Sequence, residues 1–288
     1  MFNDKRIDLI MLESIEKFLL LNDYKLIELI QESKWKKTML FKIEKDGVNY
    51  IVKSIDKASP VDIKNKFLIE VEYYKHQQYE YLPKYIESNQ ELLILEFIQG
   101  RTLREELKHN SLDTKTLALL IRNIEELYVA SKRKNKGDNN FRNAFSHLSN
   151  LLQSGPIQTK HFKTSIYKRF LNKLILLVLK FKLQWHISRI DKEDLKNGFV
   201  HGDLHYNNII IDNERNIKFI DFENIRYDGF FDFDIMYLYA MLEINIDAES
   251  EEMKMLQDAI NKLLRNKLLM KMYNLFRYSV NLNNRFFV

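Results

Sequence analysis

The sequence predicts an α+β fold in which a small lobe of strands and one helix precedes a larger, mainly helical lobe. Strand-like runs gather in the first third of the chain, whereas apolar residues after Thr102 follow helical spacing. The 288 residues, 45% hydrophobic and 12% aromatic, are enough to bury a sizeable core. We expect lobes of residues 1–98 and 99–288.

Local signals in the first lobe predict its elements in order. Residues 1–24 have the spacing of an amphipathic helix, with acidic interruptions that argue against a signal peptide. The runs MLFKIEK and VNYIVKSI flank Asp46-Gly47, a pair typical of hairpin turns. A helix is predicted over residues 64–82, stopped at Pro83, and a buried strand over Leu92–Ile98.

The second lobe has a helical pattern interrupted by one hairpin. Helices are predicted from Thr102 to about residue 195, with a loop at residues 132–140. The short apolar runs that begin at Ile209 and at Ile217 then predict a second hairpin. A last helical region is predicted over about residues 233–278.

Composition limits the classes of protein that the chain can represent. It has no cysteine, which excludes disulfides, thiolate zinc sites and cysteine nucleophiles and suits a reducing compartment. No apolar run approaches the roughly 20 residues that cross a bilayer. We therefore expect a cytoplasmic protein.

Polar residues gather at the ends of the two apolar runs in FVHGDLHYNNIIIDNERNIKFIDFENI, residues 199–225. Asp203 and Asn208 precede the first run, and Asp221 follows the second. Because a hairpin reverses the chain, we expect all three at the same end. Two carboxylates and an amide oxygen suit Mg²⁺ that carries a nucleotide phosphate. A carboxylate that the metal does not need could accept the proton of a hydroxyl nucleophile.

A nucleotide site also needs a cation for the phosphates. Lys53 lies inside a predicted strand, where a lysine most often faces solvent. The following helix carries Glu70 and Glu72, and either could pair with Lys53 and hold it toward the phosphates.

Together these motifs resemble the aminoglycoside phosphotransferase and choline kinase group, which are relatives of the protein kinases. HGDLHYNNIII is similar to the catalytic loop of that group, FIDFE to its metal-binding segment, and LLILEFIQGRTL to its hinge between lobes. The resemblance covers roughly residues 26–242. It implies a two-lobed protein-kinase-like fold and transfer of phosphate from ATP to a hydroxyl, with ATP and Mg²⁺ as cofactors.

The resemblance also implies roles for individual residues. Asp203 would be the catalytic residue that orients the acceptor hydroxyl, and Asn208 and Asp221 would hold Mg²⁺. Lys53 would contact the ATP phosphates, and Glu70 fits its helix partner better than Glu72.

Further positions match the family pattern less specifically. The backbone from Glu96 to Ile98 would meet the adenine edge. Asp234, with Asp232 as a rival, would brace the catalytic loop, although both could be ordinary helix caps. His201 is expected to support the loop structurally, and His205 to fill a turn.

The phosphate loop departs from the protein-kinase pattern. Residues 31–39, QESKWKKTM, contain no glycine, although glycine lets a backbone approach phosphate closely. Ser33 or Thr38 could serve there instead, with three lysines adding positive charge.

Charge is segregated although the net charge is only +5. Residues 139–190 and 259–288 contain no Asp or Glu but many Lys and Arg. A cationic antibiotic or choline would need carboxylates there, so the pattern disfavours both and favours an anionic sugar, lipopolysaccharide or other surface glycan. The basic C-terminal tail also predicts peripheral contact with an anionic membrane at the inner membrane surface, unless it packs on the helical lobe.

Two other classes of function stay open. The glycine-free loop is compatible with a catalytically silent kinase-like binding module. The basic stretches are compatible with nucleic-acid binding, but no recognition motif accompanies them, so we do not expect a nucleic-acid partner.

Overall fold

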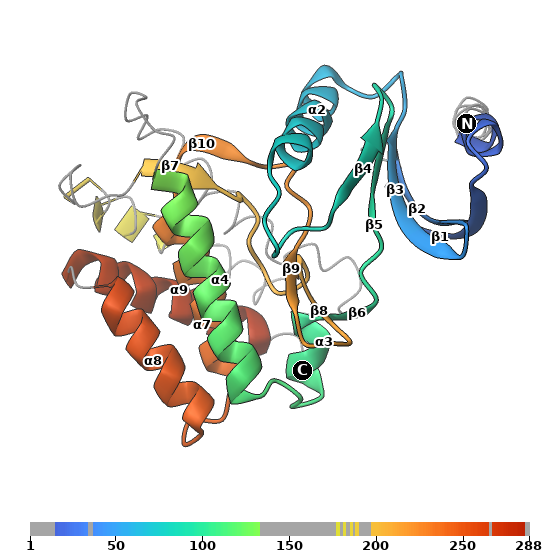
Figure 1. Cartoon of the computed structure of the whole chain (residues 1–288). Coiled ribbons are helices and arrows are strands. Elements are labelled where there is room, and N and C mark those ends of the chain that lie inside the picture. The colour runs from blue at the N-terminus through green and yellow to red at the C-terminus, as the bar shows by residue number, and fades with distance from the viewer. Residues whose placement is uncertain are drawn as a thin grey trace, which may run out of the picture. The chain divides into compact units, whose positions relative to one another are not determined.

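The computed structural model describes residues 15–33, 37–132, 177–178, 181–182, 185–186, 188–189, 197–264 and 267–285. The chain divides into two compact units. The first comprises Met1–Gly100 and Lys218–Glu223, and the second comprises Arg101–Ile217 and Asn224–Val288. The first is built on a sheet and the second mainly on helices, so the predicted α+β class is confirmed (Figure 1).

A five-stranded antiparallel sheet with the order β1-β2-β3-β5-β4 forms the first unit (Figure 1). Its strands are β1 (Lys25–Ser33), β2 (Thr38–Lys45), β3 (Val48–Ile55), β4 (Tyr85–Ser88) and β5 (Leu92–Glu96). The predicted hairpin is the β2–β3 pair. Its turn residues Asp46 and Gly47 have φ values of 52° and 77°, the left-handed conformation that tight hairpins require.

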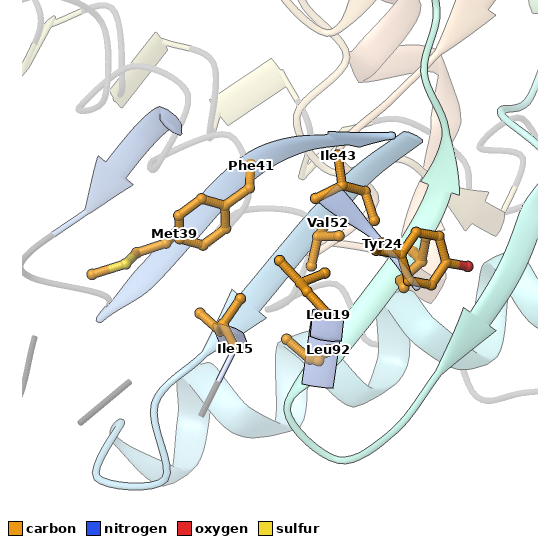
Figure 2. Close-up of a cluster of buried hydrophobic side chains, with 9 residues drawn as sticks. Ile15, Leu19, Tyr24, Met39, Phe41, Ile43, Val52 and Leu92 are labelled. Atoms are coloured by element: carbon orange, nitrogen blue, oxygen red, sulfur yellow. The ribbon is translucent and has the colours of Figure 1, made fainter. Parts of the chain in front are cut away.

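Neighbouring residues of β3 face opposite sides of this sheet, as strand geometry requires. Val52 belongs to a buried apolar cluster with Ile15 and Leu19 of a helical stretch over residues 15–21 (Figure 2). Lys53 points the other way and pairs with Glu70 of α2 (Val61–His76). The sheet therefore buries one face against the apolar cluster and carries an ionic cluster on the other.

The α2 helix ends earlier than the sequence indicates. It stops at His76, because Gln77 is extended, and does not continue to Pro83. Carbonyl groups of the segment after α2 accept hydrogen bonds from residues of β9 (Ile217–Phe219). Phe219 N donates to Tyr81 O at 2.8 Å, and Lys218 Nζ donates to the carbonyls of Glu80 and Leu82. Tertiary hydrogen bonds thus replace the last turns of the predicted helix.

The second unit is a group of helices packed around α7 (Phe231–Asn245), which contacts α4 (Thr114–Lys132), α8 (Glu251–Leu263) and α9 (Lys267–Arg285). The short α3 (Leu103–Lys108) precedes α4. The predicted helical region at 233–278 is thus three helices, and Ser250 caps the second of them by accepting from Met253 N. None of the described helices is long and apolar enough to span a membrane.

The described residues also contain short strands outside the five-stranded sheet. The predicted second hairpin is present as β8 (Ile209–Asp212) and β9, in a three-stranded sheet with β6 (Gly100–Thr102). Sequence reasoning missed the pairing of β7 (Asn197–Val200) with β10 (Arg226–Phe230). The helix predicted before residue 15, and the helices and loop predicted over most of residues 133–196, lie outside the described residues.

Candidate active site

Lys53 is the centre of an ionic cluster in the first unit. Its Nζ lies 2.7 Å from Glu70 Oε2, 3.0 Å from Asp221 Oδ1 and 3.3 Å from Glu223 Oε2. The expected pair of Lys53 with Glu70 is present, whereas Glu72 lies 3.0 Å from His76 on the exposed side of α2. One ammonium group therefore serves three carboxylates, which leaves an excess of negative charge.

The cluster shifts the pKa values of its members. Burial alone would lower the pKa of Lys53, but the charges of Asp221, Glu70 and Glu223 hold that pKa well above its usual value. Burial raises the pKa of Glu70 to about 7 against the attraction of Lys53, and the charges of Asp221 and Glu223 add to the rise. Glu70 thus keeps its proton to a higher pH than an ordinary carboxyl group does.

Asp221 has a backbone conformation that is rare outside glycine. Its φ of 62° is in the left-handed region, which costs of the order of 1 kcal/mol and is concentrated at functional sites. The conformation brings Asp221, just beyond β9, to the ammonium of Lys53. Glu223 reaches the same ammonium, and sequence reasoning missed it. Its only signal in the sequence was its place in FIDFE, two residues after Asp221.

The second unit holds the loop with Asp203 and Asn208. Asn208 Nδ2 donates to the backbone oxygen of Asp203 at 2.9 Å, so the amide nitrogen is committed to the loop and the amide oxygen is the group left to act as a metal ligand. Asp203 Oδ1 lies 3.6 Å from His205 Nε2. β8 begins at Ile209, directly after Asn208, and its fully buried side chain fixes the end of the loop.

His201 and Gly202 have structural functions in the same loop. His201 is fully buried, and its Nδ1 accepts from Asp203 N at 3.3 Å. Gly202 has a φ of 83°, and a Cβ there would lie 2.1 Å from the carbonyl oxygen of Asn224. Gly202 N donates to Asp234 Oδ2 at 3.1 Å, so Asp234 braces the loop. Its rival Asp232 is also buried, in the first turn of α7.

The remaining predicted residues lie in the first unit. Ser33 and Thr38 face each other across the end of the β1–β2 pair, and residues 34–36 between them are not described. Glu96 ends β5, and its N–H donates to Lys84 O at 2.9 Å, so this N–H is not available to an adenine edge. Ile98 follows two residues later, before β6.

The donor groups fit magnesium bound together with a nucleotide. Among the described residues, no group of three or more His, Cys, Asp or Glu side chains could hold a metal ion by itself. Mg²⁺ commonly takes one or two protein oxygens and completes its shell with phosphate and water. In the first unit the carboxylate of Asp221, which is 34% exposed, is an oxygen donor of this kind, and in the second unit the amide oxygen of Asn208 is another.

Comparisons with known proteins agree with these features. Aminoglycoside phosphotransferase APH(4)-Ia is 16% identical over 94% of this chain and 90% of its own, with a TM-score of 0.57. The streptomycin–ATP complex of APH(2'')-IIa is 16% identical over 92% and 85%, with a TM-score of 0.55. An ethanolamine kinase from Plasmodium vivax is 17% identical over 91% and 75%, with a TM-score of 0.52. No curated protein matches the sequence.

The structural matches confirm the predicted protein-kinase-like fold, and a sequence match identifies the family. The model of the phosphotransferase enzyme family matches residues 37–259, which is most of the chain and includes the Lys53 cluster and the Asp203 loop. The predicted family and enzyme class are both confirmed. The chain belongs to the phosphotransferase enzyme family.

Proposed function

We propose that this phosphotransferase moves the γ-phosphate of ATP to a hydroxyl group of a small molecule or sugar. The Lys53 cluster is the observation that carries the proposal. A half-buried ammonium group held by Glu70 and shared with Asp221 and Glu223 supplies positive charge for phosphates in a region that also attracts a metal cation. The ATP in the similar streptomycin complex supports the choice of nucleotide.

Each predicted site residue has one role in this reaction. Lys53 would contact the phosphates, Glu70 orients Lys53, and Asp221 and Asn208 would hold magnesium. Bound magnesium neutralises the charge that develops on the transferring phosphate. Asp203 accepts the proton of the acceptor hydroxyl, whose oxygen forms a bond to the γ-phosphorus as the bond to the ADP oxygen breaks.

The proposal also gives the first unit contacts with the nucleotide base and with a phosphate. Adenine would meet the carbonyl of Glu96 and the backbone of Ile98, and Ser33 would contact a phosphate through its hydroxyl. In this proposal the first unit binds the nucleotide and the helical unit carries Asp203 and the acceptor.

A basic cavity in the second unit supports an anionic acceptor. It has a volume of about 860 Å³ and its lining includes Phe181, Lys182, Trp185, His186 and Lys271. Burial lowers the pKa of His186, and the charges of Lys271, Arg189 and Lys182 lower it further, which reports a positive field. Such a field attracts phosphate or carboxylate groups, so we propose a phosphorylated or acidic sugar, as in a lipopolysaccharide, as the acceptor.

One side of α9 is buried, and this limits the ways in which the proposed membrane contact could form. The apolar residues Met272, Tyr273 and Phe276 of α9 are buried, and the Tyr273 hydroxyl donates to Glu243 of α7 at 2.6 Å. This side of the helix is therefore not available to insert into a bilayer. A peripheral contact would depend on exposed cations such as Lys271 and on the attraction of anionic headgroups.

A transfer assay tests the function and the acceptor class together. Labelled γ-phosphate of ATP is followed into phosphorylated sugars, lipopolysaccharide fragments, neutral sugars and aminoglycosides. We expect transfer to the anionic acceptors, and a loss of roughly 10²–10⁴-fold in Asp203→Asn because a general base contributes that much.

Nucleotide binding is the control in this experiment. Asp203→Asn keeps the shape of the side chain and leaves Lys53 unchanged, so the affinity for ATP with magnesium should stay at the wild-type value. Normal turnover in Asp203→Asn would contradict the catalytic assignment. Transfer to aminoglycosides but not to anionic sugars would contradict the acceptor class alone.

A further inference from the structure

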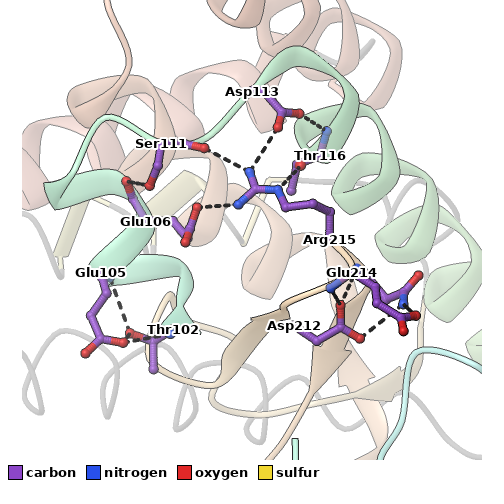
Figure 3. Close-up of polar contacts among 10 residues, drawn as sticks. Thr102, Glu105, Glu106, Ser111, Asp113, Thr116, Asp212, Glu214 and Arg215 are labelled. Atoms are coloured by element: carbon purple, nitrogen blue, oxygen red, sulfur yellow. Dashed lines mark hydrogen bonds and ion pairs between the residues drawn. The ribbon is translucent and has the colours of Figure 1, made fainter. Parts of the chain in front are cut away.

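Arg215 lies in the turn of the hairpin that connects β8 to β9. Its φ of 69° is part of a tight turn in which Asp212 accepts from Glu214 N at 2.9 Å and from Asn216 N at 2.8 Å. Arg215 N also donates to Asp212 O at 3.0 Å. The backbone of the turn is thus closed by its own residues, and the Arg215 side chain is directed away from the turn to α3 and α4 (Figure 3).

The guanidinium group of Arg215 contacts α3, α4 and the segment between them at four points. Nη1 donates to Glu106 Oε2 at 2.6 Å, and Nε donates to Thr116 Oγ1 at 3.0 Å. Nη2 donates to Ser111 O at 2.8 Å and to Asp113 Oδ2 at 3.1 Å. Figure 3 shows all four acceptors around one planar group, which an ammonium group could not reproduce.

Burial and further hydrogen bonds hold the groups that accept from Arg215 in place. The Glu106 side chain is only 6% exposed, and Thr116 is buried. Asp113 caps α4 by accepting from Thr116 N at 2.7 Å, and Ser111 Oγ donates to Glu106 O. Arg215 therefore fastens the free end of the hairpin to a rigid part of the second unit.

The other end of β8 carries a proposed metal ligand. Asn208 immediately precedes the strand, and Ile209 and Ile211 are buried, so the four-residue strand is held as one short rigid piece. β8 is the middle strand of the β6-β8-β9 sheet, and the Arg215 contacts fix the end of this strand that lies opposite Asn208. A change at Arg215 would tilt β8 and displace Asn208 from its bond with the backbone of Asp203.

We propose that Arg215 is a positioning residue for the reaction, because its four contacts with α3, α4 and the segment between them hold β8 in the orientation that places the Asn208 amide oxygen for magnesium. This inference rests on the proposed function. It extends that function to a residue that binds neither nucleotide nor metal and that lies at the opposite end of the strand.

Calorimetric titration with ATP, first without divalent metal and then with saturating Mg²⁺, tests the inference without an acceptor. The ratio of the two dissociation constants measures how much magnesium strengthens ATP binding. In Arg215→Lys we expect the metal-free constant to be unchanged and the ratio to fall about tenfold, the scale typical for residues that orient metal ligands. All titrations are made well below the melting temperature of each variant.

Two further variants make the test specific. Asp113→Asn keeps the cap of α4, because asparagine accepts as well as aspartate there, but weakens the contact with Arg215. Its ratio should fall by less than that of Arg215→Lys. The matched control is Arg122→Lys, which changes an exposed pair with Glu126 on α4 and should leave the ratio unchanged.

The outcomes separate this inference from the proposed function. A lower melting temperature with an unchanged ratio in Arg215→Lys would show that the residue is only structural and would overturn the inference alone. If Arg215→Lys does not fold, an unchanged ratio in Asp113→Asn overturns it. A wild-type protein whose ATP affinity does not respond to magnesium would contradict the proposed function, and the inference with it.

Discussion

The Lys53 cluster and the Arg215 cluster each surround one cation with carboxylates, but their charge balance differs. Lys53 has three carboxylates within 3.3 Å, from Glu70, Asp221 and Glu223. Arg215 has two carboxylates together with a carbonyl and a hydroxyl oxygen. The first cluster has the larger surplus of negative charge, and it lies in the sheet unit, whereas the second lies in the helical unit.

The pKa values of carboxyl groups shift in opposite directions in the two clusters. Burial, opposed by Lys53 and aided by the neighbouring acids, raises the pKa of Glu70 to about 7. In the Arg215 cluster the N–H of Thr116, and then the charge of Arg215, lower the pKa of Asp113. A strongly raised carboxyl pKa marks a candidate functional site, whereas the lowered pKa of Asp113 is explained by its contacts with Thr116 and Arg215. The comparison supports the proposal that the Lys53 cluster takes part in the reaction and that the Arg215 cluster holds neighbouring elements in place.

Glu70→Gln gives the largest effect expected from this comparison. Loss of the 2.7 Å ion pair frees Lys53 to move, and a displacement of 1 Å costs roughly 100-fold in turnover. The same variant tests the pKa of Glu70. Between pH 4.5 and about 7 the folded protein keeps a proton that the unfolded chain loses, so wild-type stability falls as pH rises through this window.

Urea unfolding at several pH values measures this effect. Because Glu70→Gln removes the titrating group, the wild-type free energy of unfolding should fall relative to the variant as pH rises through the window. Glu72→Gln, which changes an exposed pair on the same helix, should affect neither turnover nor this pH dependence. Parallel pH profiles for wild type and Glu70→Gln would contradict the raised pKa.

Glu106→Gln tests the Arg215 cluster and has a smaller effect. It keeps the shape of a buried side chain and removes the charge that faces Arg215, so the free energy of unfolding should fall by about 1–3 kcal/mol. Glu126→Gln, in the exposed pair with Arg122, should cost less than about 0.5 kcal/mol. Equal losses in the two variants would show that burial gives the Arg215 cluster no special importance.

Much of the fold could be predicted because its signals are local. Asp46-Gly47 marked the first hairpin, and the apolar runs after Asn208 marked the second. The β1 strand was missed because Leu26, Ile27, Leu29 and Ile30 have helix-like spacing and all are exposed. The end of α2 was missed because hydrogen bonds from β9, distant in sequence, decide it.

The candidate site also divides into features with local sequence signals and features that depend on residues distant in the sequence. The catalytic loop and FIDFE could be predicted because their residues are close together in the chain, and strand alternation leaves Lys53 only two faces. The contacts of Glu223 and Arg215 could not be predicted, because their partners lie 170 and about 100 residues away in the sequence. Only the folded chain brings these groups together.

The central claim is that Lys53 and its carboxylates bind a magnesium-bound nucleotide, and thermal melting tests it most directly. The wild-type protein and Lys53→Met are melted with ATP, with and without Mg²⁺, because a ligand that binds the folded state raises the melting temperature. We predict a magnesium-dependent rise for the wild-type protein and little or none for Lys53→Met. An equal rise in both proteins, or none in the wild type at saturating nucleotide, would contradict the claim.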